Sequence, residues 1–342
     1  MDSITQAALG ASIAGAVAGK ALGRSVLLTG ALLGTLPDLD VVIDYGTAVA
    51  NFTQHRGFSH SLFILAPLSL LIAWGLSRWQ TQISYKRWLA LVGLILITHP
   101  LLDAFTTYGT QLFWPLGRPV ALNSIFIIDP LYTLPLLAGC LAFLFRPPAT
   151  RAITAGLLVS SLYLAWTLTA QHWITERIKP ALATAGFNNA ALMVQPMPFN
   201  TILWRATAIT EDMRIEIVTG FLDDERPLSV EYFPRDPEIA RSVADFREAK
   251  RLEWFTRGFL HYDYSGSQIT TTDIRLGIPG AHPFTFILAE IGDSGPSALP
   301  SGRLPRPMMN PDALPLLWSR LTAETPVLCL ANLSAPAEGQ VC

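Results

Sequence analysis

Residues 88–105 read WLALVGLILITHPLLDAF, an apolar run with a histidine and an aspartate near its end. The run is long enough to cross a bilayer as a helix, which takes about 17 to 25 residues. His99 and Asp103 are four residues apart, so both would point from one helix face toward one ion, and Pro100 between them would kink the helix. This stretch predicts a membrane helix that carries metal-binding side chains at its end.

The composition of the 342-residue chain indicates an integral membrane protein with a soluble part. Its mean hydropathy is +0.37, and 15% of its residues are charged, against about 25% in soluble domains. A net charge of -2 without a basic run argues against nucleic acid as a partner. The opening MDSITQ has no basic n-region and no clear cleavage site follows, so the sequence predicts no removable signal peptide.

Further apolar segments predict a helical transmembrane domain over residues 1–178. Two short ones precede the others, and Gly30 and Gly34 in the second have the small-xxx-small spacing that lets helices approach closely. These two form either a tight helical hairpin, which we favour, or a re-entrant pair. The predicted fold class is a mainly α membrane bundle of about five to six hydrophobic helices. The apolar segments are 4–18, 25–36, 62–77, 88–105, 130–145 and 152–170.

The positive charges orient this bundle. Basic residues gather in the connections near residues 20–24, 78–87 and 146–151, whereas the 106–129 connection has only Arg118. By the positive-inside rule the first three connections are cytoplasmic and the last is outside. This topology predicts that eight polar residues meet at one non-cytoplasmic face: Asp2, Asp38, Asp40, His55, His60, His99, Asp103 and Asp129.

Most of these residues have side chains that build hydrolytic metal sites. Imidazole and carboxylate together favour zinc, and a bound divalent metal activates water and polarises an ester or phosphoester. Catalytic candidates are Asp40, His60 and Arg56, and the last either holds phosphate or carboxylate oxygens or forms a salt bridge to Asp38 or Asp40. Asp129 is expected to orient a histidine, and Asp2 is a further candidate. The predicted metal ligands are Asp38, Asp40, His55, His60, His99 and Asp103.

Five stretches together resemble one family: MDSITQAALGA (1–11), GTLPDLD (34–40), HRGFSHSL (55–62), THPLLDAFTTYGT (98–110) and IIDPLYTLPLL (127–137). They are similar to the YdjM family of membrane-bound metal-dependent hydrolases, over roughly residues 1–170. The resemblance implies metal-dependent hydrolysis. The chain departs from the family's usual MDxxTH opening, because Gln6 stands where the histidine is usual.

A more distant similarity is to the zinc-dependent phospholipase C and S1/P1 nuclease group. These helical enzymes use HxxxD and HxxxE pairs, which His99 with Asp103 and His172 with Glu176 match. For His172 and Glu176 we favour the alternative, a pair at the membrane interface beside Trp173.

Residues 179–342 predict a soluble, mostly β (α+β) domain outside the cytoplasm. Alternating stretches at 213–222, 228–233, 268–278 and 284–292 indicate strands, and 237–258 indicates an amphipathic helix. Cys329 and Cys342 could pair in an oxidising compartment, whereas Cys140 is a small apolar residue of a span. Four charged residues are expected in surface ion pairs, with the site as the alternative location: Arg205, Arg214, Asp273 and Arg275.

The sequence therefore favours a membrane-bound hydrolase at the outer face of the bacterial inner membrane. Membrane lipids surround it, and the site at the membrane boundary favours a lipid or lipid-linked substrate. The alternative is a non-enzymatic scaffold in which a structural metal site helps present the C-terminal domain to a partner. An ion path is disfavoured, because segments 62–77 and 130–145 have almost no polar residues.

Overall fold

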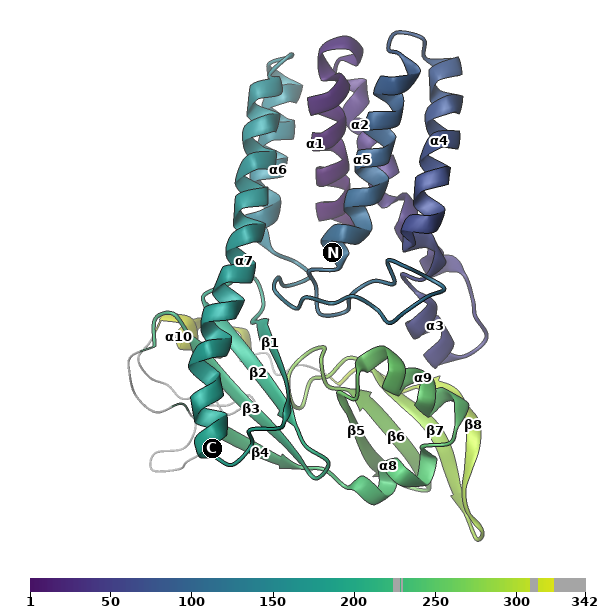
Figure 1. Ribbon diagram of the computed structural model, residues 1–342, viewed down its shortest axis with the longest axis vertical. Helices are drawn as coiled ribbons and strands as arrows, with labels where there is room; N and C mark the ends of the chain where they lie inside the picture. The colour runs from purple at the N-terminus through teal and green to yellow at the C-terminus, as the bar shows by residue number, and fades with distance from the viewer. Residues whose placement is uncertain (224–227, 229, 308–312, 323–342) are drawn as a thin grey trace. The chain divides into compact units, whose positions relative to one another are not determined.

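The computed structural model describes residues 1–223, 228, 230–307 and 313–322. The chain divides into two compact units: the first consists of 1–43, 54–169 and 198–200, and the second of 44–53, 170–197 and 201–342. The first unit is helical, and the second contains two antiparallel four-stranded sheets (Figure 1). Cys329 and Cys342, whose pairing the sequence permits, lie outside the described residues.

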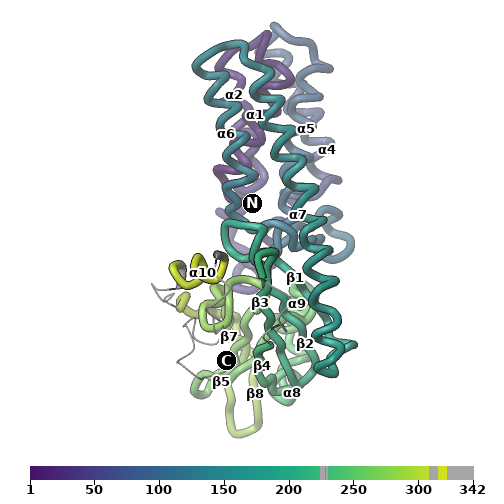
Figure 2. The backbone as a smooth tube through the Cα atoms, turned by 90° about the vertical axis from the view of Figure 1, so that its left-hand side faces the viewer, coloured from purple at the N-terminus to yellow at the C-terminus, as the bar shows by residue number. Residues whose placement is uncertain are grey.

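Helices build the first unit and run side by side in two views (Figures 1 and 2). By length and hydropathy, α4 and α7 could each cross a membrane, and α2 and α6 are shorter apolar helices. The predicted span at 152–170 is the first part of α7, which continues into the second unit. The helices up to α7, of which α3 lies in the second unit except for its last residue, are α1 (Ser3–Leu22), α2 (Ser25–Thr35), the 3-10 helix η1 (Leu36–Val42), α3 (Ala48–Gln54), the 3-10 helix η2 (Phe58–His60), α4 (Leu62–Trp79), α5 (Tyr85–Asp103), α6 (Pro130–Phe145) and α7 (Thr150–Thr184).

Helices α1 and α2 form a hairpin in which backbone touches backbone. A Cβ added at Gly10 would lie 2.2 Å from the carbonyl oxygen of Gly30, and one added at Gly34 would lie 2.5 Å from that of Gln6. No side chain fits at such distances, so only glycine permits this approach. Gly30 and Gly34 thus allow α2 to approach α1 closely, and both pack against Gly10 of α1.

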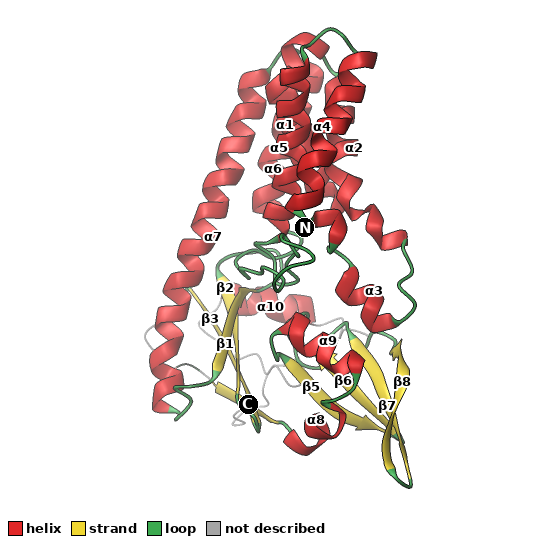
Figure 3. Cartoon of the chain, turned by 45° about the vertical axis from the view of Figure 1, so that its right-hand side comes forward, coloured by secondary structure: helices red, strands yellow, loops and turns green. Residues whose placement is uncertain are grey.

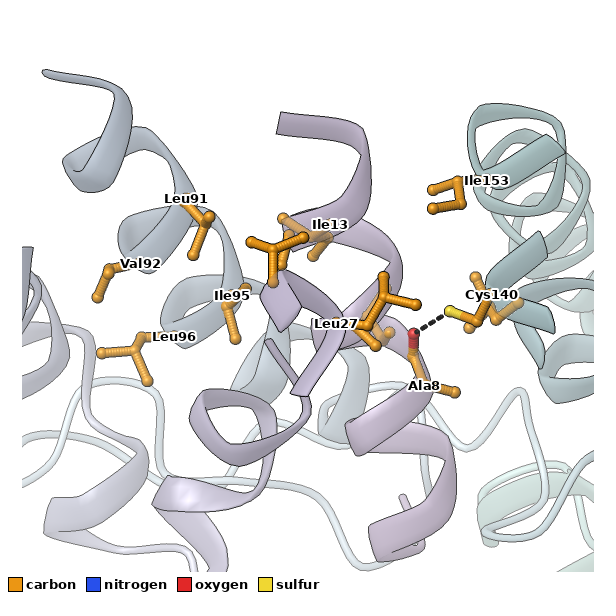
Figure 4. Close-up of a cluster of buried hydrophobic side chains, with 14 of the residues drawn as sticks. Ala8, Ile13, Leu27, Leu91, Val92, Ile95, Leu96, Cys140 and Ile153 are labelled. Carbon is orange, nitrogen blue, oxygen red and sulfur yellow. Dashed lines mark hydrogen bonds between the residues drawn. The ribbon is translucent and has the colours of Figure 1, made fainter. Parts of the chain in front are cut away.

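Helix α5 contributes to the apolar core of the helical unit and contains two of the candidate metal-binding residues at its end. Its buried side chains recur at helical spacing, beginning with Trp88 and continuing through Leu91, Ile95 and Leu96. Figure 4 shows the last three of these side chains. The same buried stripe ends at Asp103, where polar side chains replace apolar ones. The packing that fixes α5 therefore also fixes the direction of the polar groups at its end.

The second unit contains two meander sheets, each of strands in sequence order. Helices α8 and α9 accompany the second sheet (Figure 3). The predicted single helix at 237–258 is wrong, because the backbone of Phe246 is extended (φ -70°, ψ 138°) and separates two helices. The bounds are β1 (Ala191–Pro196), β2 (Leu203–Ile209), β3 (Met213–Gly220), β4 (Val230–Pro234), α8 (Pro237–Val243), α9 (Arg247–Thr256), β5 (Leu260–Ser265), β6 (Gln268–Asp273), β7 (Thr285–Gly292), β8 (Gly295–Arg303) and α10 (Ala313–Thr322).

Buried ion pairs hold this unit together, and the expectation of surface pairs is wrong. Arg205 is buried and binds both carboxylate oxygens of Glu216, at 2.9 and 2.7 Å. Arg275 and Asp273, also buried, form a second two-point pair at 3.0 and 2.7 Å. Arg214 is buried too and stacks on the ring of Phe233. Such pairs fix strand positions, because breaking one would leave an uncompensated buried charge.

His282 is a buried titratable group whose neutral form the fold requires. Its Nδ1 donates to the carbonyl oxygen of Leu276 at 2.8 Å, and its Nε2 lies 3.4 Å from Arg214 Nη1. Burial, together with the nearby charges of Arg205 and Arg214, lowers the pKa of His282 to about 3. His261, a further neighbour, also has a lowered pKa, because of burial and Arg214.

This depressed pKa predicts acid sensitivity of the second unit. Between about pH 6.5 and pH 3 the unfolded chain binds a proton at His282 that the folded chain does not, so stability falls as pH falls through that window. The slope from one such group reaches about 1.4 kcal/mol per pH unit. Urea unfolding of the full chain at pH 7 and pH 5 should show a smaller pH effect in His282→Gln than in wild type. Equal pH effects in both proteins would contradict the assignment.

Candidate metal centre

Four side chains from three separate segments converge at the end of α5. Asp38 comes from η1, His60 from η2, and His99 and Asp103 from α5. One ligand atom of each lies within 4.8 Å of all the others. His60 Nε2 lies 3.1 Å from His99 Nε2, 3.3 Å from Asp38 Oδ1 and 3.2 Å from Asp103 Oδ2, and His99 Nε2 lies 3.5 Å from each carboxylate oxygen.

Hydrogen bonds to Nδ1 of His60 and His99 determine which ring nitrogen has a free lone pair toward the centre. His99 Nδ1 lies 2.6 Å from the carbonyl oxygen of Gly34, which can only accept, so Nδ1 carries the proton. The hydroxyl of Ser59 donates to Asp40 Oδ2 at 2.7 Å and therefore accepts from His60 Nδ1 at 2.9 Å. Each neutral ring then presents an unprotonated Nε2, as metal-binding histidines do.

The resulting arrangement fits a divalent cation. Asp38 Oδ1 and Asp103 Oδ2 are buried without a hydrogen-bond partner among the described residues, so four lone-pair donors face one another. The two carboxylates supply anionic oxygens and the two neutral imidazoles supply nitrogens, which are donor types that zinc takes in proteins. Zinc bonds of about 2.0–2.1 Å in a tetrahedron imply ligand separations of about 3.3–3.4 Å. The five separations that involve a histidine are 3.1–3.5 Å, and all four ligand atoms lie within 4.8 Å of one another.

A proton competes with a cation for this position. Burial lowers the pKa of His60, but the nearby carboxylates of Asp103 and Asp38 raise it above its usual value overall. Because the pKa is raised, protonation of His60 would oppose metal binding more strongly as the pH falls.

Arg56 lies beside Asp103 and has a strained backbone conformation. Its φ of 59° is left-handed, which is uncommon for a non-glycine residue. Its Nε lies 3.4 Å from Asp103 Oδ2 and its Nη2 donates to the carbonyl oxygen of Met1 at 3.2 Å. Its Nη1 is buried without a hydrogen-bond partner in the described part of the chain. The structure thus pairs Arg56 with Asp103, whereas the predicted salt-bridge partners were Asp38 and Asp40.

Asp40 and His55, both predicted ligands, form a dyad beside the four-residue group. Asp40 Oδ1 lies 2.8 Å from His55 Nδ1, and Asp40 Oδ2 also accepts from the backbone N–H of Arg56 at 2.9 Å. Burial alone would raise the pKa of Asp40, but hydrogen bonds from His55 and Ser59 lower it, so Asp40 is a carboxylate at neutral pH. His55 must then donate through Nδ1, which leaves the lone pair on Nε2 of a side chain that is 26% exposed.

Gln6 takes part in the site as a donor. Its Nε2 donates to Asp103 Oδ1 and to the carbonyl oxygen of His99, both at 3.1 Å. The amino group of Met1 also pairs with Asp103 Oδ1. Asp103 therefore uses one oxygen for these donors and keeps Oδ2 for the centre. Gln6, at the position where the similar family usually has histidine, therefore orients Asp103, a candidate ligand.

The remaining predicted site residues have other partners. Asp2 caps α1 by accepting from the backbone N–H groups of Ile4 and Thr5, both at 3.0 Å. Asp129 caps α6 by accepting from the backbone N–H of Leu131 at 2.9 Å, and it also accepts from the hydroxyl of Tyr163 at 2.8 Å. Among the described residues these hydrogen bonds involve no histidine, contrary to the expectation that Asp129 orients one. His172 and Glu176 are exposed on the part of α7 that belongs to the second unit, and Glu176 pairs with Lys179 at 2.6 Å.

Comparisons with known proteins place these residues in a family. The sequence profile described as YdjM inner membrane protein matches residues 1–174. Inner membrane protein YbcI of Escherichia coli (strain K12) is 36% identical over 112 residues, which are 32% of this chain and 64% of that protein. Uncharacterized protein YfhP of Bacillus subtilis (strain 168) is 28% identical over 138 residues, which are 38% of this chain and 42% of that protein.

The chain thus spans less than two thirds of the length of either relative. No solved structure matches it significantly. The family match covers half of the chain and includes every residue of the four-residue group, which confirms the resemblance seen in the sequence motifs. This chain belongs to the YdjM inner membrane protein family.

Proposed function

We propose that this protein is a membrane-bound metal-dependent hydrolase that cleaves an ester or phosphoester. The observation that carries the proposal is the convergence of Asp38, His60, His99 and Asp103. Hydrogen bonds to Nδ1 leave Nε2 of both imidazoles available, and two carboxylate oxygens have no hydrogen-bond partner among the described residues. This mixed donor set suits zinc. When bound, such an ion would polarise the scissile group and activate water for attack.

Two side chains next to the donors supply the other functions that hydrolysis needs. Arg56 Nη1, a buried donor without a partner among the described residues, would bind an anionic oxygen of the substrate. His55 Nε2, with its tautomer set by Asp40, would accept a proton at the exposed edge of the site. An anion-binding guanidinium favours a phosphoester over an uncharged ester.

The helix that carries Asp38 and Asp40 supports a lipid or lipid-linked substrate. In η1 the side chains of Asp38 and Asp40 are 17% and 1% exposed, while Leu39, Val41 and Val42 are 57%, 71% and 80% exposed. Exposed apolar side chains beside catalytic carboxylates suit an amphiphile whose cleaved bond lies at the membrane surface. Membership of an inner membrane family is consistent with this source of substrate.

We further propose that α1, α2, α4, α5, α6 and the first part of α7 form the membrane bundle, with the site and the second unit on the periplasmic side. The positive-inside rule supports this orientation. In a background with Cys140, Cys329 and Cys342 changed to alanine, an impermeant thiol reagent on intact cells should label Arg118→Cys and Glu211→Cys but not Lys86→Cys. The reverse pattern would place the site in the cytoplasm.

A direct assay tests the reaction itself. Wild-type protein in proteoliposomes should hydrolyse a phospholipid of the same vesicles, lose this activity after chelation and regain it with zinc. A soluble nitrophenyl phosphate should react more slowly, because it does not partition into the membrane surface. Absence of metal-dependent hydrolysis of both the lipid and the soluble ester would contradict the hydrolase proposal.

The completeness of the donor set favours a second candidate function. Four protein donors suffice for a closed tetrahedral site, which is typical of structural zinc, whereas catalytic zinc usually keeps one position open. A scaffold would then use the centre to tie η1 and η2 to α5. In an enzyme the replaceable donor would be Asp38, since its side chain is 17% exposed and the other three are at most 1% exposed.

A further inference from the structure

The chain leaves the helical unit in the middle of the candidate site. Asp40 belongs to the first unit, residues 44–53 belong to the second, and His55 belongs to the first again. We call residues 44–53 the inserted segment. The two loops that supply Asp38, Asp40, His55 and His60 are therefore joined through a piece of the second unit.

An aromatic cluster holds the inserted segment in place. The ring of Phe52 lies 5.2 Å from that of Phe255, 4.6 Å from that of Phe284 and 5.2 Å from that of Phe286, measured between ring centroids. These partners come from α9, the strand β7 and the residue before it. Aromatic pairs at these separations contribute beyond the burial of their area, so Phe52 ties the segment to the core of the second unit.

Polar contacts fix both ends of the same segment. Near its start, Glu248 accepts from the hydroxyls of Thr47 at 2.9 Å and Ser301 at 2.8 Å, and Ser301 in turn accepts from the backbone N–H of Val49 at 2.9 Å. At its end, Arg251 donates through Nε to Thr53 Oγ1 at 2.9 Å and through Nη2 to the Thr53 carbonyl oxygen at 3.1 Å.

The connection between the inserted segment and the site is short. Arg56 follows Thr53 by three residues, which span at most about 11 Å, and it is held in a left-handed conformation. A Cβ at the next residue, Gly57, would lie 2.7 Å from the carbonyl oxygen of Gln54, so the turn is tight. The short connection links the inserted segment to the backbone N–H of Arg56, which donates to Asp40 Oδ2 at 2.9 Å.

We propose that the second unit positions the metal centre by holding the inserted segment, with Phe52, Glu248 and Arg251 as positioning residues. Loss of this anchorage frees η1 and the 54–61 loop, which carry Asp38 and His60. The consequence for metal affinity rests on the proposed function. The structural consequence, greater mobility of η1 and the 54–61 loop, does not depend on the proposed function.

Hydrogen exchange in the full-length protein tests the inference without any metal. Phe52→Ala and Arg251→Ala should each raise amide exchange rates at residues 36–43 and 54–61 at least 10-fold, and Arg251→Lys should restore part of the protection. Ile217→Ala, which removes a buried side chain of β3 in a different part of the second unit, is the control for general destabilisation. When the variants are compared at equal losses of melting temperature, Ile217→Ala should leave the amide exchange rates at residues 36–43 and 54–61 unchanged.

Cobalt affinity supplies the second readout. The wild type should bind Co²⁺, and Phe52→Ala and Arg251→Ala should bind it at least 10-fold more weakly than Ile217→Ala. Unchanged exchange in both variants, or equal exchange in the Ile217→Ala control, would overturn the positioning role. If the wild type binds no Co²⁺, the proposed function fails, whereas the exchange rates still decide the inference. Arg251→Ala decides it where Phe52→Ala does not fold.

Discussion

His60→Ala should abolish hydrolysis by the proposed enzyme. His60 Nε2 is within 3.1–3.3 Å of the other three donor atoms, so its loss opens the centre on the side of η2. Substitution of residues that only orient ligands costs about 10–100-fold. We therefore expect Ser59→Ala to lose about 10–100-fold in kcat/KM, and His60→Ala to lose more than that.

The matched control for this change is another histidine of the same chain. His172→Ala, on an exposed part of α7, should retain wild-type activity. All three variants should be compared in proteoliposomes at equal protein content, with circular dichroism to verify folding. Retention of more than a tenth of the activity by His60→Ala would contradict its assignment as a ligand.

Gly30→Ala should strongly destabilise the helical unit. A Cβ at this position would lie 2.3 Å from the carbonyl oxygen of Gly10 and 2.6 Å from the Cβ of Ala14, so the α1–α2 hairpin would have to separate. Overpacking of this kind costs about 1–3 kcal/mol. Thermal unfolding in detergent should therefore show a clearly lower midpoint, and Gly10→Ala should behave alike.

Gly75→Ala is the control, because nothing lies within 4 Å of a Cβ at that helical position. It should be neutral or stabilising by up to about 1 kcal/mol, since alanine favours helix more than glycine does. The Gly30→Ala change should also weaken metal binding, because α2 carries the Gly34 carbonyl that sets the tautomer of His99. Equal midpoints for Gly30→Ala and Gly75→Ala would contradict the packing described for the hairpin.

Helical spacing made part of the site predictable. His99 and Asp103 lie four residues apart on one buried stripe, and the structure brings their ligand atoms together. Asp38 and Asp40 were both expected as metal ligands, yet only Asp38 belongs to the four-residue group, whereas Asp40 pairs with His55. The physical reason is that η1 is a 3-10 helix with about three residues per turn, so residues two apart point to different sides.

Other parts of the site have no sequence signal. The Gly34 carbonyl and the Ser59 hydroxyl, which orient the two imidazoles, could be recognised only once the helices were packed. The inserted segment likewise has no motif that assigns it to the second unit. Strand register decides the Arg205–Glu216 pair, because it places these residues on neighbouring strands β2 and β3. Register was not available from alternating hydrophobicity alone.

The metal content of detergent-purified protein, prepared without chelators, tests the central claim most directly. Wild type and Glu176→Gln should retain a transition metal in stoichiometric amount, most of it zinc, by plasma mass spectrometry. The double variant His99→Ala, Asp103→Ala should retain none, since two of the four donors are gone. A wild-type protein without stoichiometric transition metal, or a double variant that retains as much as wild type, would contradict the metal centre.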